Sequence, residues 1–248
     1  MSATHTDNQD LWSPEEFTRQ LRAIGEAGYH DKHPFHVLMH EGKLTKRQLQ
    51  AWIENRFYYQ TIIPKKDAAI MARIDDPALR RAWIQRILDH DGTKDNPDGG
   101  INKWLVLGEA AGLDRQDVAD LRYVLPGARF AVDAYVTYVK DHSLMEAVAS
   151  SLTELFAPTL MARRLPAFEE HYPWVKPEGL EYFRSRLSQA PRDVEFGLGY
   201  VLRECQTRVQ QEQAIVALQT KCHILWSLLD SMHFAYVCPG LLPPLWGK

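Results

Sequence analysis

Positively charged and amide side chains stand within residues 55–71, a segment otherwise aromatic and apolar enough to belong to a protein core. Arg56 and Gln60 are four positions apart, so they share one face of a helix. Because burying a charge without a partner is strongly unfavourable, these side chains need either an ion-pair partner or an anionic ligand with polar edges. Lys65 and Lys66 follow a proline, where cations oppose the helix dipole, so they mark either a solvated helix start or the same ligand. The segment alone leaves both alternatives open.

A second pair, Arg86 and His90, closes an apolar helix and is again four positions apart. A histidine at a helix end usually just caps the last carbonyl groups. His90, however, lies between Asp89 and Asp91, and a histidine beside carboxylates can be tuned as a general acid or base, because its ordinary pKa is near neutrality. On these residues alone the capping interpretation is favoured.

Other polar groups interrupt helices that are otherwise built for a core. Thr153 and Glu154 lie among leucine and phenylalanine, where a glutamate is rarely buried unless paired, and Arg164 is the candidate partner. Further polar side chains enter apolar helices in the same way: Tyr182, Arg186 and Lys221. Together these groups favour an internal pocket for a polyanionic, aromatic molecule.

Four histidines near the N-terminus could suggest a metal site: His30, His33, His36 and His40. The last two suit one helix face, but Pro34 separates them from His30, and the chain has no Glu-x-x-His motif of the kind that carboxylate-bridged di-iron bundles use. Glu154 and Asp193 are possible carboxylate ligands, but neither has a paired histidine at that spacing. We therefore expect no metal site, and Tyr29 and His30 instead form a polar wall.

Composition excludes several classes of protein. The 248 residues carry a net charge of −3, which does not favour a nucleic-acid binder. No stretch reaches the length of a membrane helix, and the polar N-terminus does not resemble a signal peptide. The three cysteines match no zinc motif and suggest a reduced, cytoplasmic protein. Phosphate-binding loops, dinucleotide fingerprints and nucleophile elbows are also missing.

Helical periodicity and helix-capping residues predict one all-α domain over residues 13–237, between a disordered tail at 1–12 and a C-terminal tail at 238–248. Pro64 and Pro158 are expected to break helices. The predicted helices cover about 13–28, 45–62, a short piece through 71, 76–90, 101–111, 114–122, 127–141, 144–156, 159–170, 177–189, 191–209 and 211–237. Short connections between them indicate a compact helical bundle.

The chain resembles the pyrroloquinoline-quinone synthase family, whose members act in the last step of pyrroloquinoline quinone (PQQ) biosynthesis. The resemblance runs from about residue 13 to about residue 237. The similar segments are 29–30 with 33–34, 55–60 with Pro64 and 66–71, 86–92, 125–127 with 129–135, 150–158, 171–174 and 182–189. Long, ordered runs of this kind are more specific than any single motif above.

The resemblance implies a heme-oxygenase-like bundle that works as a cytoplasmic homodimer without a metal or an organic redox cofactor. The implied enzyme is an oxidoreductase that acts on CH–CH groups. It closes a ring and removes eight electrons from a bicyclic tricarboxylic precursor (AHQQ), using O2 as co-substrate and releasing H2O2, with PQQ as the bound product. Neither nucleic acid nor membrane is an expected partner.

The resemblance also assigns roles to residues. His90 is the implied principal proton-transfer group, Tyr182 and Arg186 stand near the dioxygen site, and His30 belongs with these catalytic residues. The implied substrate-binding residues are Tyr29, Arg56, Gln60, Lys66, Arg86, Tyr135, Thr153, Glu154, Arg164 and Lys221. Lys65 becomes the solvated neighbour of Lys66.

One position departs from the family pattern. Family members can carry a histidine one turn before Arg164, where this chain has Met161. A thioether neither shuttles protons nor donates a hydrogen bond, so either that histidine is dispensable or the later oxidation steps differ here.

Two alternatives remain at this stage: a non-catalytic carrier or sensor that binds a polyanionic quinone, and a helical di-iron oxygenase. The carrier predicts that loss of His90 leaves function unchanged, and the oxygenase predicts stoichiometric iron.

Overall fold

The computed structural model describes residues 11–238, and within that range the regular structure is helical with no strand. The α-helices are α1 (Pro14–Gly28), α2 (Pro34–His40), α3 (Lys46–Met71), α4 (Pro77–Asp91), α5 (Gly100–Ala110), α6 (Arg115–Ala119), α7 (Pro126–Asp141), α8 (Leu144–Ser150), α9 (Ala157–His171), α10 (Glu181–Glu204) and α11 (Arg208–Tyr236). Three 3₁₀ turns join them at His30–Lys32, Ser151–Phe156 and Pro177–Leu180. The all-α prediction is confirmed.

The predicted tails fall mostly outside the described residues. Trp12, which the sequence assigned to the N-terminal tail, exchanges two hydrogen bonds of 3.0 Å with Gln211 of α11. Its ring also stacks near Phe17, with 6.3 Å between centroids. The packed part of the chain therefore begins slightly before the predicted boundary.

Capping side chains start the helices where the sequence predicted them. The Ser13 hydroxyl accepts from the Glu16 backbone N–H, and Pro14 occupies the first turn of α1. Thr45 and Gln48 form a capping box at the start of α3. Such caps satisfy backbone donors that a helix leaves without an intrahelical partner.

The prediction for Pro64 was wrong, because Pro64 lies inside α3, which continues without a break to Met71. Pro158 does mark a helix boundary: the 3₁₀ turn that carries Glu154 ends at Phe156, and Pro158 occupies the first turn of α9. A proline in a first turn costs nothing, because its missing N–H would have no intrahelical partner there. In α3 the buried surroundings of Pro64 stabilise a helix that local propensity disfavours. Similarly, α10 runs through Pro191 and joins the two predicted helices 177–189 and 191–209.

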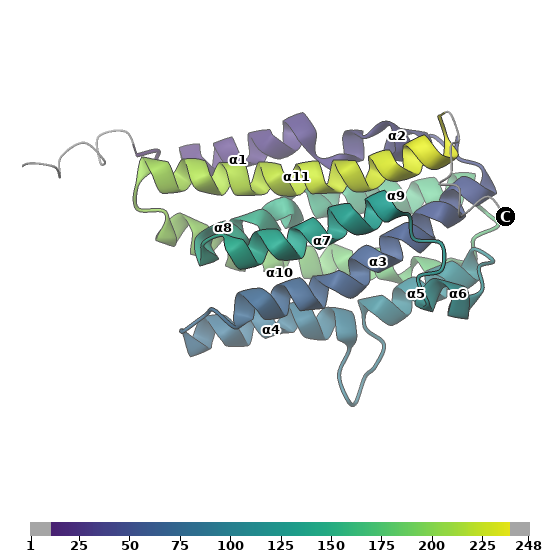
Figure 1. The fold of residues 1–248 in the computed structure, drawn as a ribbon, viewed down its shortest axis with the longest axis horizontal. Coiled ribbons are helices and arrows are strands. Elements are labelled where there is room, and N and C mark those ends of the chain that lie inside the picture. Colours follow the sequence, from purple (N-terminus) through teal and green to yellow (C-terminus); the bar gives the residue numbers. More distant parts are fainter. Residues whose placement is uncertain (1–10, 239–248) are drawn as a thin grey trace, which may run out of the picture.

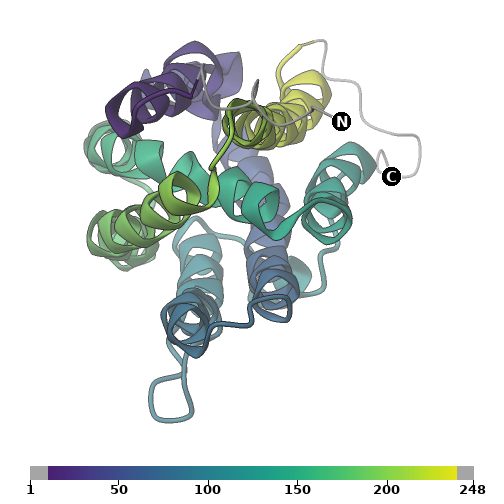
Figure 2. The same cartoon turned by 90° about the vertical axis from the view of Figure 1, so that its left-hand side faces the viewer.

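The longer helices lie roughly along the long axis of the molecule, and the end-on view shows them gathered around one core (Figures 1 and 2). α11 packs against α1, α7 and α8, and α3 packs against α4, α5 and α7. The 3₁₀ turn Ser151–Phe156 contacts α9, α10 and α11 and lies deep in this arrangement. These elements bring most of the predicted site residues together.

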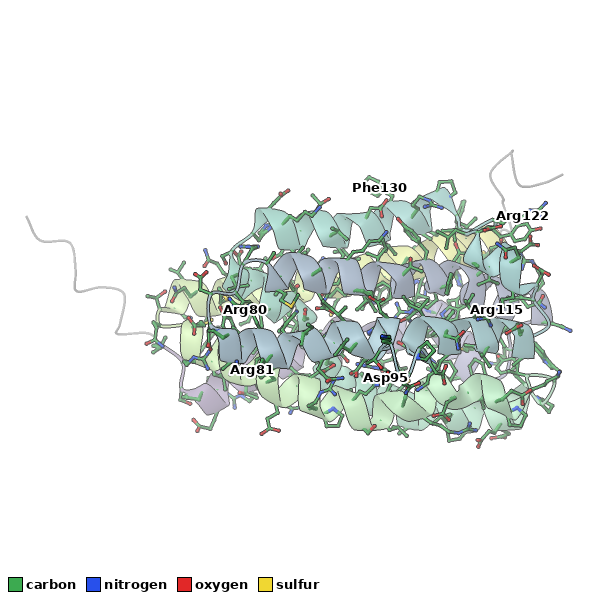
Figure 3. The ribbon with its side chains drawn as sticks, turned by 90° about the horizontal axis from the view of Figure 1, so that it is seen from below. Arg80, Arg81, Asp95, Arg115, Arg122 and Phe130 are labelled. Atoms are coloured by element: carbon green, nitrogen blue, oxygen red, sulfur yellow. The ribbon has the colours of Figure 1, made fainter. Side chains whose placement is uncertain are left out.

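Figure 3 shows the face formed by α4 and the loop that follows it. Arg80 and Arg81 of α4 are exposed on this face, and Asp95 marks the loop between α4 and α5. Phe130 of α7 is 79% exposed, the largest fraction among the exposed large apolar side chains of the described residues. In residues 11–238 no helix combines the length and the hydropathy required to cross a bilayer.

Candidate active site

A cavity opens between α3, α9 and α10 and encloses about 560 Å³ including its mouth. α4, α5, α11 and the 3₁₀ turn Ser151–Phe156 also contribute side chains to its wall. The predicted site residues in this wall are Tyr29, His30, Arg56, Gln60, His90, Thr153, Glu154, Arg164, Tyr182 and Arg186.

Four predicted site residues lie just outside this wall: Lys66, Arg86, Tyr135 and Lys221. Lys221 Nζ is 3.5 Å from the ring centroid of Tyr135 and 4.3 Å from that of Tyr59, which does line the cavity. Lys66 Nζ lies 5.4 Å from the Tyr135 ring. These residues form a second layer directly behind the cavity. Lys65, in contrast, is exposed, as the sequence predicted.

At one end of the cavity, cations and carboxylates are closely paired. Lys66 Nζ donates to Asp67 Oδ1 at 2.5 Å and to Ser151 Oγ at 3.1 Å. Arg86 Nε also lies 3.3 Å from Asp67 Oδ1. Burial alone would raise the pKa of Asp67, but Lys66 and Arg86 outweigh it and lower that pKa. Asp67 is therefore a buried carboxylate that these two cations hold in the ionised form.

Glu154 and Asp193 complete this paired end. Arg186 Nη2 donates to Glu154 Oε2 at 2.5 Å, and Arg86 Nη2 lies 3.4 Å from Glu154 Oε1. Burial by itself would raise the pKa of Glu154, but Arg186 and Arg86 lower it to about 2. Asp193 Oδ2 lies 3.0 Å from Arg86 Nη1 and 3.8 Å from Arg186 Nη2. The prediction that Arg164 pairs with Glu154 was therefore wrong, because α4 and α10 bring nearer arginines to it.

Three other cations in or beside the wall have no such partners. Within residues 11–238, no carboxylate forms an ion pair with Arg56, Arg164 or Lys221. Lys221 Nζ and Arg164 Nε are buried atoms without a hydrogen-bond partner. Burial and the neighbouring Arg56 lower the pKa of both Arg164 and Lys221. These cations therefore favour an anionic guest, which would supply the missing partners.

His90 both caps its helix and lines the cavity. Its Nδ1 lies 3.0 Å from the backbone oxygen of Arg86, so Nδ1 carries the proton and donates. Nε2 then holds the lone pair, and it is buried without a hydrogen-bond partner. Burial and the Arg186 charge lower the pKa of His90 to about 4, so the ring is neutral near pH 7. The capping interpretation and the general-base interpretation are thus compatible.

Tyr182 and Gln60 form a polar pair across the cavity. The Tyr182 hydroxyl donates to Gln60 Oε1 at 2.9 Å, while Gln60 Nε2 is buried without a partner. The hydroxyl oxygen of Tyr182 can still accept a further hydrogen bond. Burial raises the pKa of Tyr182, which keeps the phenol protonated.

Apolar side chains make up the rest of the wall: Ile63, Trp104, Ala157, Leu160, Met161 and Leu225. Met161 is 7% exposed and stands one turn before Arg164 on α9. The cavity wall is therefore amphipathic, with both charged and apolar side chains.

Sequence reasoning did not single out Asp67, and it considered Asp193 and His36 only as metal ligands, yet all three position the cavity wall. Asp67 and Asp193 hold Arg86, and His36 lies 3.0 Å from His30, from Nδ1 to Nδ1. Asp67 directly follows Lys66, so a carboxylate beside a cation in an apolar helix could have indicated the pair. Asp193 and His36 depend on contacts between distant helices, which the local sequence does not reveal.

The four N-terminal histidines do not converge. His33 Nε2 lies 3.0 Å from Asp230 Oδ1, apart from the others, and Nδ1 of His33 caps α2. In the described part of the chain no three His, Cys, Asp or Glu side chains are grouped as metal ligands would be.

Comparison with known proteins matches residues 18–231 to the model of the TENA/THI-4/PQQC family. A pyrroloquinoline-quinone synthase of Acidiphilium cryptum is 55% identical over 234 residues, covering 94% of this chain and 95% of the relative. One of Xanthomonas campestris pv. campestris is 54% identical over 234 residues, covering 94% and 93% of the two chains. The resemblance predicted from the sequence is confirmed by these relatives.

Solved structures with much lower identity share the fold. A domain of unknown function with a heme oxygenase-like fold from Shewanella denitrificans has a TM-score of 0.71 at 14% identity, covering 94% of this chain and 97% of that chain. A TenA homologue from Pseudomonas syringae pv. tomato also has a TM-score of 0.71, at 12% identity, covering 93% and 99%. The predicted heme-oxygenase-like bundle is confirmed, and the chain belongs to the TENA/THI-4/PQQC family.

Proposed function

We propose that this chain is a pyrroloquinoline-quinone synthase, an oxidoreductase of PQQ biosynthesis. It closes a ring in the bicyclic tricarboxylic precursor and removes eight electrons, with O2 as acceptor and H2O2 as a released product. The observation that carries the proposal is the cavity itself. It combines cations that lack protein carboxylates with a neutral histidine whose lone pair is unpartnered.

The carboxylates of the precursor bind at the cations without protein carboxylate partners, which are Arg56, Arg164 and Lys221. A carboxylate there satisfies buried donors that have no partner in the unliganded protein. Lys66, Arg86 and Arg186 attract a polyanion less, because Asp67, Glu154 and Asp193 already neutralise them. This difference supports binding of the carboxylates at the cations without protein partners.

His90 takes the proton in the proposed reaction. Its Nε2 is the lone-pair nitrogen, and the ring is neutral before substrate arrives. Oriented general bases of this kind act efficiently because geometry and protonation state are set before the reaction.

Arg186 and Tyr182 stabilise the reduced oxygen species. Both line the cavity on α10, and the nearby apolar section, which includes Leu160 and Met161, provides a site for uncharged O2. A fixed guanidinium stabilises negative charge as it develops on oxygen. A methionine at position 161 adds neither a proton donor nor a base there.

The proposed enzyme uses no metal and no organic redox cofactor, because the substrate becomes quinonoid and passes its own electrons to O2. Its chemistry requires orientation, proton transfer and charge stabilisation from the protein. We also propose that the enzyme acts as a cytoplasmic homodimer.

The decisive experiment mixes the purified protein with the precursor under anaerobic conditions and then adds O2. PQQ absorbance and peroxide should appear only after the addition, and metal analysis of the same sample should find no stoichiometric iron. Formation of PQQ that depends on added iron would instead favour an oxygenase.

The variant His90→Ala separates an enzyme from a carrier. It should bind PQQ but lose turnover of the precursor by about 100-fold or more, as expected when a general base is removed. Unchanged turnover would remove His90 from the proposed role.

A further inference from the structure

His36 stands behind the cavity and has no part in the reaction proposed above. The side chain is 2% exposed and lies on α2, next to two residues of the cavity wall, His30 and Arg164. Its ring packs at right angles to Trp52, with 5.9 Å between centroids. Most buried polar side chains have at least one hydrogen-bond partner, and His36 has several.

Three contacts surround the His36 ring. Nδ1 lies 3.0 Å from the backbone oxygen of His30 and 3.0 Å from Nδ1 of the same residue. Arg164 Nη2 lies 3.4 Å from both ring nitrogens of His36. The backbone oxygen of His30 can only accept a hydrogen bond, and the guanidinium of Arg164 can only donate one. The Nδ1 atom of His30 can do either, depending on its tautomer.

Both imidazoles are neutral near pH 7. Burial, followed by the charges of Arg56 and Arg164, lowers the pKa of His30 well below its ordinary value. Burial and Arg164 do the same to the pKa of His36. A neutral imidazole carries a single N–H, so one ring nitrogen donates and the other accepts.

The contact with the backbone oxygen of His30 decides the arrangement of protons. That oxygen can only accept, so Nδ1 of His36 must carry the proton, and Nε2 of the neutral ring is then the acceptor. Arg164 Nη2 lies equally far from both ring nitrogens and can only donate, so it is compatible with a lone pair on Nε2. The Nδ1 atom of His30 then faces an N–H group and must accept, which leaves the His30 proton on Nε2.

We infer that His36 is a positioning residue: it fixes His30 in the Nε2–H tautomer, so that His30 offers a hydrogen-bond donor to a molecule in the cavity, and it holds the guanidinium of Arg164 beside it. The inference deepens and rests on the proposed function, in which that molecule is a polycarboxylate or a quinone.

His30 and His90 therefore line the same cavity with opposite tautomers. His90 donates from Nδ1 to the Arg86 backbone oxygen, so its Nε2 is a lone pair. His30 accepts at Nδ1, so its Nε2 is a donor. One histidine accepts a proton from the substrate, and the other donates a hydrogen bond to a substrate oxygen. Of these two residues, His90 is then the base, and His30 acts through hydrogen bonding.

Nitrogen-15 NMR of the unliganded wild-type protein tests the tautomer without any assay of activity. Long-range correlations between ring protons and ring nitrogens distinguish the two neutral forms of histidine, and the variants His30→Asn and His90→Asn assign the signals. We expect His30 to be protonated at Nε2 and His90 at Nδ1. A His30 ring protonated at Nδ1 would overturn the inference.

Paired variants at position 36 test the positioning role. His36→Leu removes the donor, and the affinity for PQQ should fall about tenfold, which is the effect of losing one well-placed hydrogen bond. His36→Asn keeps an N–H near the position of Nδ1 and should retain most of that affinity. Equal losses in the two variants would show that position 36 serves packing alone and would overturn the inference.

His40→Gln is the matched control. His40 lies one turn further along α2, and both of its ring nitrogens are buried without a hydrogen-bond partner. Its replacement should leave the His30 signals and PQQ affinity unchanged. If wild-type protein neither binds PQQ nor forms it from the precursor, the proposed function fails, whereas the NMR pattern still decides the tautomer. If His36→Leu does not fold, the wild-type NMR spectrum and His36→Asn still decide the inference.

Discussion

Lys66 and Lys221 are both buried lysines near the cavity, but they differ in their partners. Lys66 contacts the carboxylate of Asp67 at 2.5 Å, whereas Lys221 Nζ lies over two tyrosine rings and has no hydrogen-bond partner. Removing an unpaired buried charge removes the free-energy cost of burying that charge away from water. Removing one partner of a buried ion pair leaves the other charge buried without compensation. The two lysines should therefore respond oppositely to the same substitution.

For Lys221→Met we predict that the free energy of unfolding of the unliganded protein rises by about 1 kcal/mol and that PQQ binding weakens strongly. For Lys66→Met we predict a loss of about 3 kcal/mol, because Asp67 loses a partner. Urea unfolding measures the free energy of unfolding of both variants, and equilibrium dialysis measures their affinity for PQQ. A stabilised Lys66→Met protein would contradict this account of the charge pairs.

The pH dependence of turnover should reflect the environment of His90. Burial and the Arg186 charge lower the pKa of His90 to about 4 in the unliganded protein, so the basic form persists as pH falls from 8 to about 5. We predict that kcat/KM shows no loss attributable to His90 near pH 6.5, where an exposed histidine would titrate. A decrease centred near pH 6.5 that His90→Gln removes would contradict the prediction.

The cations of the cavity could be predicted from the residue types along the chain, but the carboxylates that pair with them could not. Arg56, Gln60 and Glu154 were recognisable because polar side chains in an apolar helix need partners. The partners of Glu154 turned out to be Arg86 and Arg186, on two other helices. Pairing across helices depends on three-dimensional packing, which a pattern along one helix cannot specify.

At the scale of the helices, two glycines should respond oppositely to alanine. A Cβ atom at Gly25 of α1 would stand 2.1 Å from the ring of Phe156, and that ring packs 5.1 Å from Tyr29 in the cavity wall. A Cβ atom at Gly199 of α10 would have no neighbour within 4 Å. Gly25 thus permits a close approach of α1 to the 3₁₀ turn, while Gly199 only lowers helix propensity.

We predict that Gly25→Ala destabilises the protein by about 2 kcal/mol through overpacking and also weakens PQQ binding, because Tyr29 shifts. Gly199→Ala should stabilise it by about 0.5–1 kcal/mol. Thermal unfolding of both variants beside the wild type checks the signs. Equal effects at the two positions would show that the Phe156 contact does not matter.

Helix starts were more predictable than helix interiors. Ser13, Thr45 and Asp76 cap helices through contacts within a few residues, so the sequence contains the information. Pro64 and Pro191 lie inside helices because the core on their flanks offsets the missing hydrogen bond. That compensation comes from other elements and has no local sequence signal.

For the whole molecule, buried neutral histidines should make the fold sensitive to mild acid. Burial is the main cause that lowers the pKa of five histidines, His33 among them, and the shift is large at four: His30, His36, His40 and His90. Below pH 6.5 the unfolded chain binds protons at these residues that the folded chain does not bind. Stability therefore rises with pH across this window and is lost as pH falls.

We predict that the free energy of unfolding falls by about 1 kcal/mol per histidine between pH 6.5 and pH 5.5, or about 4 kcal/mol in total. Urea titrations at these two pH values and at pH 7.5 measure the change. His40→Gln should reduce the loss by about 1 kcal/mol, since the pKa of His40 is about 3. A stability that does not change over this window would show that these histidines are protonated in the folded protein.

Trp104 stands in the cavity wall, 1% exposed, with its ring 4.9 Å from that of Tyr182 and 5.3 Å from that of Trp52. Its indole N–H donates to the backbone oxygen of Ile53 at 2.9 Å, so the ring is rigidly held in an apolar environment. An indole so placed emits light, and a quinone in van der Waals contact would accept its excitation energy. Binding of PQQ in the cavity should therefore quench the intrinsic ultraviolet fluorescence of the protein, so that binding and release can each be followed optically without a dye.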